Sequence, residues 1–405
     1  MKRKLMYALM AITAMTALSS CEEEDLKKVY DEKTSLDSPF ILSEGYQDTI
    51  VHPYDLPVPI SDWLGMVRDE TKVCKLSIPG THDTMTGMGF YDSTLKYVFN
   101  ITAISQIATF EEQMTKGVRF FDIRPVVGLD TLAKNPADRQ ILRLAHGISE
   151  INMTFEEALD QMQAYLKTHP TEFFIAKIQA DNGMENQSNW TVLLHKLLHK
   201  EKYSSLFVTN WKPDITVGEM RGKVLILSRF DLRTLDYPAA YCTWTDEDPD
   251  VDENINATQQ RNRAIYNVAD TTIKTTFYVQ DYYKSNSQKR MDIKKQTVID
   301  MMNSARAATA SDENIWIVNH CSAYTEVSPR GYLTNAAILH PLVIKNLQEK
   351  EGTVGIMPID MACHDYVHCV INGGTPYTSD YLYGFHPLSQ SLVNLLVKSN
   401  KSYFK

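Results

Sequence analysis

The stretch Val118-Arg-Phe-Phe-Asp-Ile-Arg124 combines a short run of apolar and aromatic residues with charged side chains at its end. Runs of this composition, roughly four to eight residues long, are typical of buried β-strands. Similar runs recur along the whole chain, and polar residues follow most of them. The eight expected strands are Lys75–Pro79, Val118–Ile123, Leu142–Ala145, Phe173–Ile178, Lys223–Leu227, Phe277–Val279, Ile315–Val318 and Thr353–Pro358.

Helical patterns lie between many of these strands. Thr154 and Glu157 have the spacing of a capping box at the start of one helix. The expected helices are Ile104–Lys116, Thr154–Thr168, Trp190–His199, Met291–Ala307, Ala337–Glu349 and Leu388–Val397. Near-continuous apolar strands that alternate with helices indicate the α/β class and a parallel sheet covered on both faces. Eight such strands predict a closed (β/α)8 TIM barrel in a single domain.

The polar residues at the strand ends support a barrel over an open sheet. The carboxyl ends of the strands meet at one mouth of a barrel, where catalytic groups converge, whereas an open sheet would spread them along an edge. These residues are His82, Asp122, Arg124, His146, Lys177, Arg229, Asp281, Asn319 and Asp360. The segment between Asp236 and Asp270 fits no regular element and is expected to be an insertion at the rim.

The composition excludes several classes of protein. The chain has 405 residues, of which 43% are hydrophobic and 22% charged, enough for a full core and unlike a disordered chain. The formal charge is −9, and the first 20 residues hold three basic residues and no acidic one, so the remainder is more acidic still. We therefore expect no nucleic-acid partner. No apolar run reaches the roughly 20 residues of a membrane-spanning helix, so membrane contact is expected to be peripheral or lipid-anchored.

The N-terminus has the pattern of an export signal. Three basic residues precede the mostly apolar stretch Leu5–Leu18, and Leu18-Ser-Ser-Cys21 follows. This ending resembles a bacterial lipobox, which implies a signal peptide at 1–20, lipidation of Cys21 and a lipoprotein of the cell envelope, at the outer membrane or cell surface. A secreted protein without the lipid is the alternative. We expect an acidic tether at 21–56 and the catalytic domain at 57–405.

Two histidines and an arginine stand out among the polar residues. His82 and Asp83 end the first expected strand, Asp122 and Arg124 share one face of the second, and His146 ends the third. The chain has no Gly-x-Ser-x-Gly elbow and no His-Glu-x-x-His helix. This set favours phosphodiester cleavage, with one histidine as base and the other as acid, over acyl transfer or zinc proteolysis.

The run Ser77-Ile-Pro-Gly-Thr-His-Asp83, the strand Phe121-Asp-Ile-Arg124 and Ala145-His-Gly147 resemble bacterial phosphatidylinositol-specific phospholipase C. The resemblance covers roughly residues 60 to 400 and implies a distorted (β/α)8 barrel that cleaves phosphatidylinositol or a glycosylated form of it. It continues in order through further matching positions. These are Lys177, Arg229, Asp281, Tyr283 and Asp360.

The resemblance also implies a role for each residue. His82, held by Asp360, corresponds to the general base, and His146, coupled to Asp83, to the general acid. Arg124, positioned by Asp122, corresponds to the group that neutralises the phosphate. Lys177, Arg229 and Asp281 correspond to ligands of the inositol headgroup, with Tyr283 as the surface on which its ring rests. No metal or other cofactor is expected, and the partners implied are the phosphatidylinositol headgroup and a membrane surface, met by a monomer.

Other interpretations remain open from the residues. A metal-dependent glycerophosphodiester phosphodiesterase shares the barrel, but it is expected to have His-Arg-Gly after the first strand, where this chain has His82-Asp83-Thr84. A non-catalytic inositol-lipid-binding module is the third possibility. Cys363 to Cys369 is interpreted as packing or a disulfide rather than a zinc site, and Asp246 to Asp252 as a solvated insertion rather than a calcium loop. The apolar loop Met85–Tyr91 is expected to enter the bilayer interface.

Overall fold

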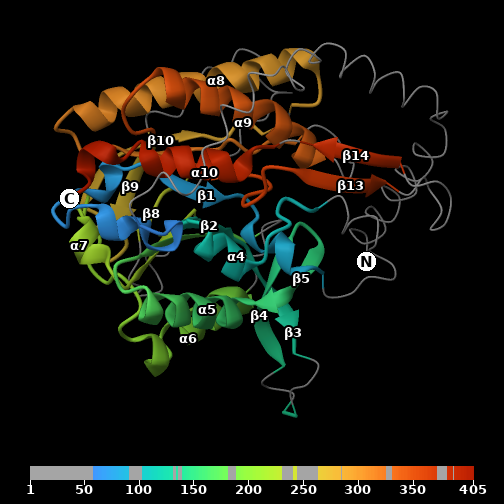
Figure 1. Ribbon diagram of the computed structural model, residues 1–405. Helices are drawn as coiled ribbons and strands as arrows, with labels where there is room; N and C mark the ends of the chain where they lie inside the picture. Colours follow the sequence, from blue (N-terminus) through green and yellow to red (C-terminus); the bar gives the residue numbers. More distant parts are fainter. Residues whose placement is uncertain are drawn as a thin grey trace. The chain divides into compact units, whose positions relative to one another are not determined.

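The described part of the chain closes a barrel of nine strands. In the computed structural model (Figure 1), the hydrogen-bonded strands follow the closed order β1-β12-β11-β10-β9-β8-β7-β6-β2. Their bounds are β1 Ile78–Thr81, β2 Phe120–Ile123, β6 Phe174–Ile178, β7 Val224–Ser228, β8 Ala240–Tyr241, β9 Arg263–Asn267, β10 Lys274–Gln280, β11 Trp316–Asn319 and β12 Ile356–Ile359. The structure describes residues 58–90, 103–130, 134–135, 139–180, 188–229, 240–243, 263–283, 285–324, 331–371, 381–385 and 387–405, all in the unit Val51–Lys405. The expected TIM-type barrel is confirmed.

Eight of the nine barrel strands run parallel, and β9 runs antiparallel to both of its neighbours, β8 and β10. Two of these strands lie between Asp236 and Asp270, so the prediction of no regular element there was wrong. Neither strand has the apolar run on which the sequence argument depends. β8 contains two residues, and β9 is largely half-buried.

The expected third barrel strand, Leu142–Ala145, lies in a different sheet. It forms part of β4 (Gln140–His146), which pairs antiparallel with β3 (Pro125–Leu129) and β5 (Ser149–Thr154) in a separate three-stranded sheet, green in Figure 1. The strand itself was predicted, but its place in the barrel was wrong. A short apolar run indicates burial and does not say which strand becomes its partner.

Helices follow most of the parallel strands and carry clear start signals. They are α4 Phe110–Thr115, α5 Phe155–Thr168, α6 Ser188–Leu198, α7 Val217–Met220, α8 Gln288–Ala310, α9 Gly331–Glu349 and α10 Ser389–Lys398. The predicted capping box at α5 is present, with Thr154 and Glu157 bonding each other's backbone N–H groups at 3.1 and 2.7 Å. The helix expected from Ile104 begins only at Phe110, because Thr109 and Glu112 form another capping box there.

Apolar side chains fill the interior of the barrel below the carboxyl ends of its strands. Alternate residues of the strands point inward, as the two-residue period of a strand requires. They form one buried cluster with Trp63 of the 3-10 helix η3 (Ile60–Met66). Its barrel members include Ile175, Leu225, Leu227, Phe277, Val279, Trp316, Val318 and Ile356. Burying each such side chain contributes about 1.5–3 kcal/mol, so this layer fixes the strands that carry the polar residues above it.

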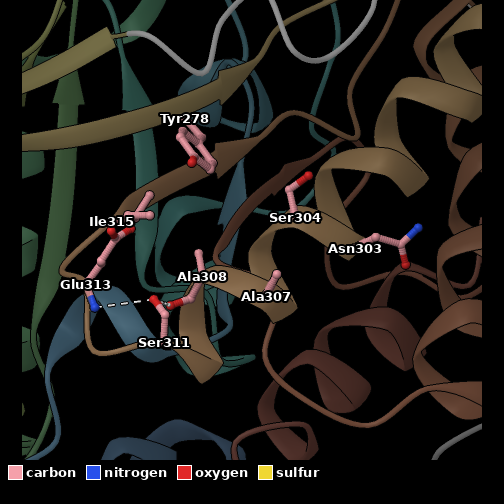
Figure 2. A pocket seen from close by; sticks show the side chains of 8 residues that line it. All are labelled: Tyr278, Asn303, Ser304, Ala307, Ala308, Ser311, Glu313 and Ile315. Carbon is pink, nitrogen blue, oxygen red and sulfur yellow. Dashed lines mark hydrogen bonds between the residues drawn. The ribbon is translucent and has the colours of Figure 1, made fainter.

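A groove of about 470 Å³ lies on the outer side of the barrel, where α8 meets β10 (Figure 2). Tyr278 of β10 and Ser304 of α8 line it, and the backbone N–H of Glu313 donates to Oγ of Ser311 at 3.3 Å. The ionisable residues in its lining are Tyr278 and Glu313. None of the described helices combines the length and apolar character needed to cross a bilayer.

Candidate active site

Polar side chains replace apolar ones where the strands reach the carboxyl end of the barrel. On β2 the inward residue after Phe120 is Asp122, and on β6 the inward residue after Ile175 is Lys177. The residues that directly follow β1, β7, β10 and β12 are His82, Arg229, Asp281 and Asp360. These six predicted residues therefore meet at one mouth, as expected of this fold.

His82 has a carboxylate oxygen at each of its ring nitrogens. Nδ1 lies 2.9 Å from Oδ1 of Asp360, and Nε2 lies 3.2 Å from Oδ2 of Asp83. Burial, with the positive charge of Arg124, holds the pKa of His82 well below 6.5, so its imidazole is neutral at physiological pH. Burial and the charge of Asp83 raise the pKa of Asp360 well above its usual value. A neutral imidazole oriented by a carboxylate has the chemistry of a general base.

Asp83 connects the other polar groups at the mouth. Its backbone has φ 44° and ψ 51°, the left-handed region, which aspartate tolerates better than most residues. Its Oδ1 lies 2.6 Å from Nε of Arg124, and its Oδ2 lies 3.1 Å from Nε2 of His146. The expected coupling of Asp83 to His146 is present, and Asp83 also holds Arg124 and contacts His82, which the sequence did not indicate.

His146 reaches the mouth from the end of β4, outside the barrel. Its Nδ1 lies 2.7 Å from the carbonyl oxygen of Ala103, and its Nε2 faces Asp83 at 3.1 Å. A carbonyl oxygen and a carboxylate both accept hydrogen bonds, so the two nitrogens of His146 face two acceptors. A ring held in this way at the mouth has the position that a general acid requires. The ring centroids of His146 and His82 are 6.4 Å apart.

Asp122 lies between two cations. Its Oδ2 is 2.9 Å from Nη2 of Arg124, and its Oδ1 is 2.7 Å from Nζ of Lys177. Burial acts to raise the pKa of Asp122, but Arg124 and Lys177 outweigh it and hold the pKa well below its usual range. Burial lowers the pKa of Lys177, and the pairing with Asp122 opposes this. Arg124 is thus oriented by Asp122, as predicted, and its side chain is 13% exposed at the mouth.

The predicted headgroup ligands form a second cluster at the mouth, joined by a residue that sequence reasoning missed. Oε1 of Gln179 accepts hydrogen bonds from Lys177 Nζ at 2.6 Å and from Arg229 Nη1 at 2.8 Å. Arg229 Nη1 lies 3.9 Å from Oδ2 of Asp281. Tyr283 follows two residues later, and its carbonyl oxygen accepts from the backbone of Tyr324. Gln179 lies two residues after Lys177, so the two-residue period was the available signal for it.

Asn319 was the polar residue expected at the mouth from the end of β11, and this prediction was wrong by one position. The side chain of Asn319 faces outward, where its Nδ2 donates to a carbonyl of α8 at 3.0 Å. His320 takes the inward place and is 2% exposed, with its ring centroid 6.4 Å from that of His82. Alternation from the inward residues Trp316 and Val318 leads to His320, so the strand period predicts it.

Tyr332 of α9 is a second residue that the sequence did not reveal. Its hydroxyl lies 3.4 Å from Nε2 of His146, and its ring centroid is 5.9 Å from those of both His82 and His146. Burial, with the charge of Asp83, raises its pKa well above 10, so the phenol stays protonated. Tyr332 lies at the start of a helix, where no strand pattern points to the mouth.

Among the described residues, one group has the spacing of a metal site. Ligand atoms of His82, Asp83 and Asp122 lie within 4.8 Å of one another. The two carboxylates are already paired with Arg124 and Lys177 at 2.6 to 2.9 Å. These cations would repel a divalent ion placed beside them, so the arrangement does not fit the acidic, oxygen-rich cage that Ca²⁺ prefers.

Some of the remaining predictions are wrong, and others concern residues that the structure does not describe. Met85 is 2% exposed and packs inside, so its expected contact with a bilayer was wrong. Met88 and Phe90 are half-buried, and Tyr91 lies outside the described residues. Cys363 is a free thiol, which excludes the disulfide considered for it. The side chain of Cys369, the leader, Cys21, the tether and the acidic residues 246–252 also lie outside what the structure describes.

Comparison with known proteins gives relatives that include bacterial 1-phosphatidylinositol phosphodiesterases. The chain is 26% identical over 177 residues to the 1-phosphatidylinositol phosphodiesterase of Listeria monocytogenes, covering 44% of this chain and 51% of the relative. It is 23% identical over 307 residues to the 1-phosphatidylinositol phosphodiesterase of Staphylococcus aureus strain Newman, covering 74% of this chain and 88% of the relative. A scan against models of protein families gives no match.

Solved structures show the same fold. A phosphatidylinositol-specific phospholipase C from S. aureus aligns with a TM-score of 0.61 at 18% identity, over 83% of this chain and 97% of that one. The enzyme from L. monocytogenes aligns with a TM-score of 0.55 at 20% identity, over 85% of this chain and 99% of that one.

This chain is similar in sequence to bacterial 1-phosphatidylinositol phosphodiesterases and shares the fold of bacterial phosphatidylinositol-specific phospholipases C. The resemblance seen in the sequence is thereby confirmed. The expected base, His82, lies on the barrel, whereas the expected acid, His146, lies on the neighbouring antiparallel sheet.

Proposed function

We propose that the protein cleaves phosphatidylinositol into diacylglycerol and inositol 1,2-cyclic phosphate. One observation carries this proposal: His82 and His146 both lie within 3.2 Å of the same oxygen of Asp83, with Arg124 bound to the other oxygen. Two histidines around one cation suit in-line displacement at phosphorus, in which one proton is removed as another is supplied. The names of the curated relatives support the same substrate.

The reaction begins at the 2-hydroxyl of the inositol. Nε2 of His82 takes the hydroxyl proton as the oxygen attacks phosphorus and forms the cyclic diester. The resulting imidazolium has a carboxylate oxygen at each nitrogen, Asp360 at 2.9 Å and Asp83 at 3.2 Å, and both stabilise its charge.

The bond from phosphorus to the diacylglycerol oxygen then breaks. Nε2–H of His146 supplies the proton to that leaving oxygen, and Arg124 donates to a non-bridging phosphate oxygen, where negative charge increases in the transition state. Each proton-transfer group is expected to contribute about 100- to 10,000-fold to the rate. Lys177, Arg229 and Asp281 bind the inositol hydroxyls, and Tyr283 contacts the ring.

Phosphorus NMR tests the proposed reaction directly, because it detects the phosphate product. Purified protein is incubated with phosphatidylinositol vesicles, and phosphorus NMR records the signal of a five-membered cyclic phosphate, with the His82→Ala variant as control. We expect the cyclic product and diacylglycerol from the wild type and neither from the variant. Vesicles left intact by the wild type would overturn the proposal.

We also infer that lipidation of Cys21 anchors the protein to the cell envelope, which would place the barrel beside its lipid substrate. The Leu18-Ser-Ser-Cys21 motif supports this inference. Cys21→Ser is expected to move the protein from the membrane fraction to the soluble fraction of cells. Unchanged membrane association of Cys21→Ser would refute the anchor.

A further inference from the structure

His320 is a buried histidine that the mechanism above does not use. It directly follows β11, as His82 follows β1 and Asp360 follows β12, so it occupies the same level of the barrel mouth. It is 2% exposed, and its ring centroid lies 6.4 Å from that of His82 at an angle of 86°. Within the described residues, neither of its ring nitrogens has a hydrogen-bond partner.

The backbone of His320 is firmly held, in contrast to its side chain. Its N–H donates to the carbonyl oxygen of Gln280 at 2.9 Å. Its own carbonyl oxygen accepts from Gln280 Nε2 at 2.8 Å and from Lys294 Nζ at 2.6 Å. The imidazole is therefore fixed at the mouth by the main chain, while its two polar atoms remain unsatisfied.

A buried imidazole without hydrogen-bond partners does not increase the stability of the fold. Each buried polar atom without a partner loses its hydrogen bonds to water and gains none in return. An apolar ring of similar size would avoid that loss. A histidine at this position is therefore explained by a ligand that enters the mouth and supplies the missing hydrogen bond.

We propose that His320 binds a hydroxyl of the inositol ring and so acts as an additional substrate-binding residue. This inference rests on the proposed function, and it adds a residue to the headgroup site formed by Lys177, Arg229 and Asp281.

The chemistry of the surroundings matches a polyol. Burial lowers the pKa of His320 to about 4, partly opposed by the charge of Asp281, so the ring is neutral at physiological pH. A neutral imidazole has one N–H donor and one acceptor, and a hydroxyl can serve either. Arg124, which pairs with Asp83 and Asp122, provides the fixed cation for the phosphate. The position of His320, with a neutral ring and the carboxylate of Asp281 nearby, therefore suits an uncharged hydroxyl.

Replacement of His320 by phenylalanine separates a ligand-binding role from a structural one. We expect His320→Phe to fold, to raise the Tm by a few degrees, and to weaken binding of free myo-inositol about fivefold or more. Binding is measured by NMR titration of the purified protein with myo-inositol, and the Tm by thermal unfolding. Lower thermal stability with unchanged myo-inositol affinity would assign His320 to packing and overturn the proposal.

His340 provides a matched control, because it is also completely buried but has a partner for Nδ1, the carbonyl oxygen of Pro387 at 3.0 Å. His340→Asn is expected to lower the Tm and leave the affinity for myo-inositol unchanged.

A direct measurement uses protein labelled with ¹⁵N at histidine. The ring-nitrogen signals of His320, assigned by their loss in His320→Phe, are expected to shift when myo-inositol saturates the wild type. No shift in a wild type that binds myo-inositol would refute the role of His320 alone. A wild type that binds no myo-inositol and cleaves no phosphatidylinositol would refute the proposed function, and this inference with it.

Discussion

His82 and His146 are joined through a single atom: their Nε2 nitrogens lie 3.2 and 3.1 Å from the same carboxylate oxygen, Oδ2 of Asp83. The two proton-transfer groups of the proposed reaction therefore share one negative charge. When His82 gains a proton and His146 loses one, the net charge around Asp83 stays the same, which limits the electrostatic cost of the step.

Removal of either histidine is expected to abolish most activity while the fold remains. We expect His82→Ala and His146→Ala each to lower kcat by about 100- to 10,000-fold on phosphatidylinositol, with circular dichroism unchanged. A substrate with a very good leaving group needs no acid, so it should restore much of the activity of His146→Ala and none of that of His82→Ala. An equal loss of activity of His146→Ala on both substrates, or recovery of His82→Ala on the activated one, would contradict the assigned pair of roles.

Asp83→Asn is expected to impair both histidines together. The amide keeps the size of the side chain but removes the charge that His82, His146 and Arg124 contact. The loss in kcat for Asp83→Asn with His146→Ala should therefore be well below the product of the two single losses. Steady-state kinetics of the four proteins in this cycle measure the coupling, and strictly multiplicative effects would show that Asp83 acts separately from His146.

Arg124 is expected to take the place of a metal ion in this site. Arg124→Ala should lower transition-state stabilisation by about 2.7–4 kcal/mol or more, the range found for loss of one oxyanion donor. Arg124→Lys should recover little, because an ammonium cannot reproduce the two-nitrogen contact that the guanidinium makes with Asp83 and Asp122. We expect wild-type activity to survive EDTA. Loss of activity in EDTA and its return with Ca²⁺ would falsify this assignment.

The buried ion pair between Arg119 and Glu172 is expected to matter for stability rather than activity. Both side chains are completely buried, with Nη2 and Oε2 2.8 Å apart. Glu172→Gln leaves the guanidinium without a counter-charge and should lower the free energy of unfolding by about 3–5 kcal/mol. The exposed pair Lys401–Glu351 is the control, since Glu351→Gln should leave the urea midpoint unchanged. A similar midpoint for both variants would show that the buried pair is not stabilising.

Stability is expected to fall on the acid side of neutrality. The folded-state pKa values of His320 and His340 are about 4 and about 3, below the ordinary 6.5, so the unfolded chain binds protons first as the pH falls. The free energy of unfolding should therefore decrease from about pH 6.5 downward, by on the order of 3 kcal/mol for His320 by pH 4, while these two histidines contribute no change above pH 6.5. Urea unfolding at several pH values checks this slope. His320→Phe should show a smaller loss, and an unaltered slope in that variant would contradict the burial argument.

The barrel and most of the site could be predicted because they depend on local patterns. The two-residue strand period placed Asp122 and Lys177 on inward faces, and the strand ends placed His82 and Asp360 at the mouth. The prediction failed where the outcome depends on partners distant in the chain. Nothing in the residues of β4 says that it pairs with β3 and β5 instead of β2.

Site residues and barrel strands that depend on tertiary packing could not be predicted either. Tyr332 enters the site from a helix, and its place between the two histidines follows from tertiary packing alone. β9 has a short apolar run, Ala264–Tyr266, that was not predicted as a strand, and its antiparallel pairing lies at a point of the barrel that no local rule identifies.

The position of His146 on the three-stranded sheet divides the chemistry between two parts of the chain. The segment from Pro125 to Thr154 holds the proposed proton donor, while the proposed base, the guanidinium and the proposed headgroup ligands all come from barrel strands or the residues that follow them. Substitutions or insertions within this segment can therefore change which leaving groups the enzyme expels without altering the attack on phosphorus. The same barrel could in this way accept a new class of inositol phosphodiester through variation of one hairpin sheet.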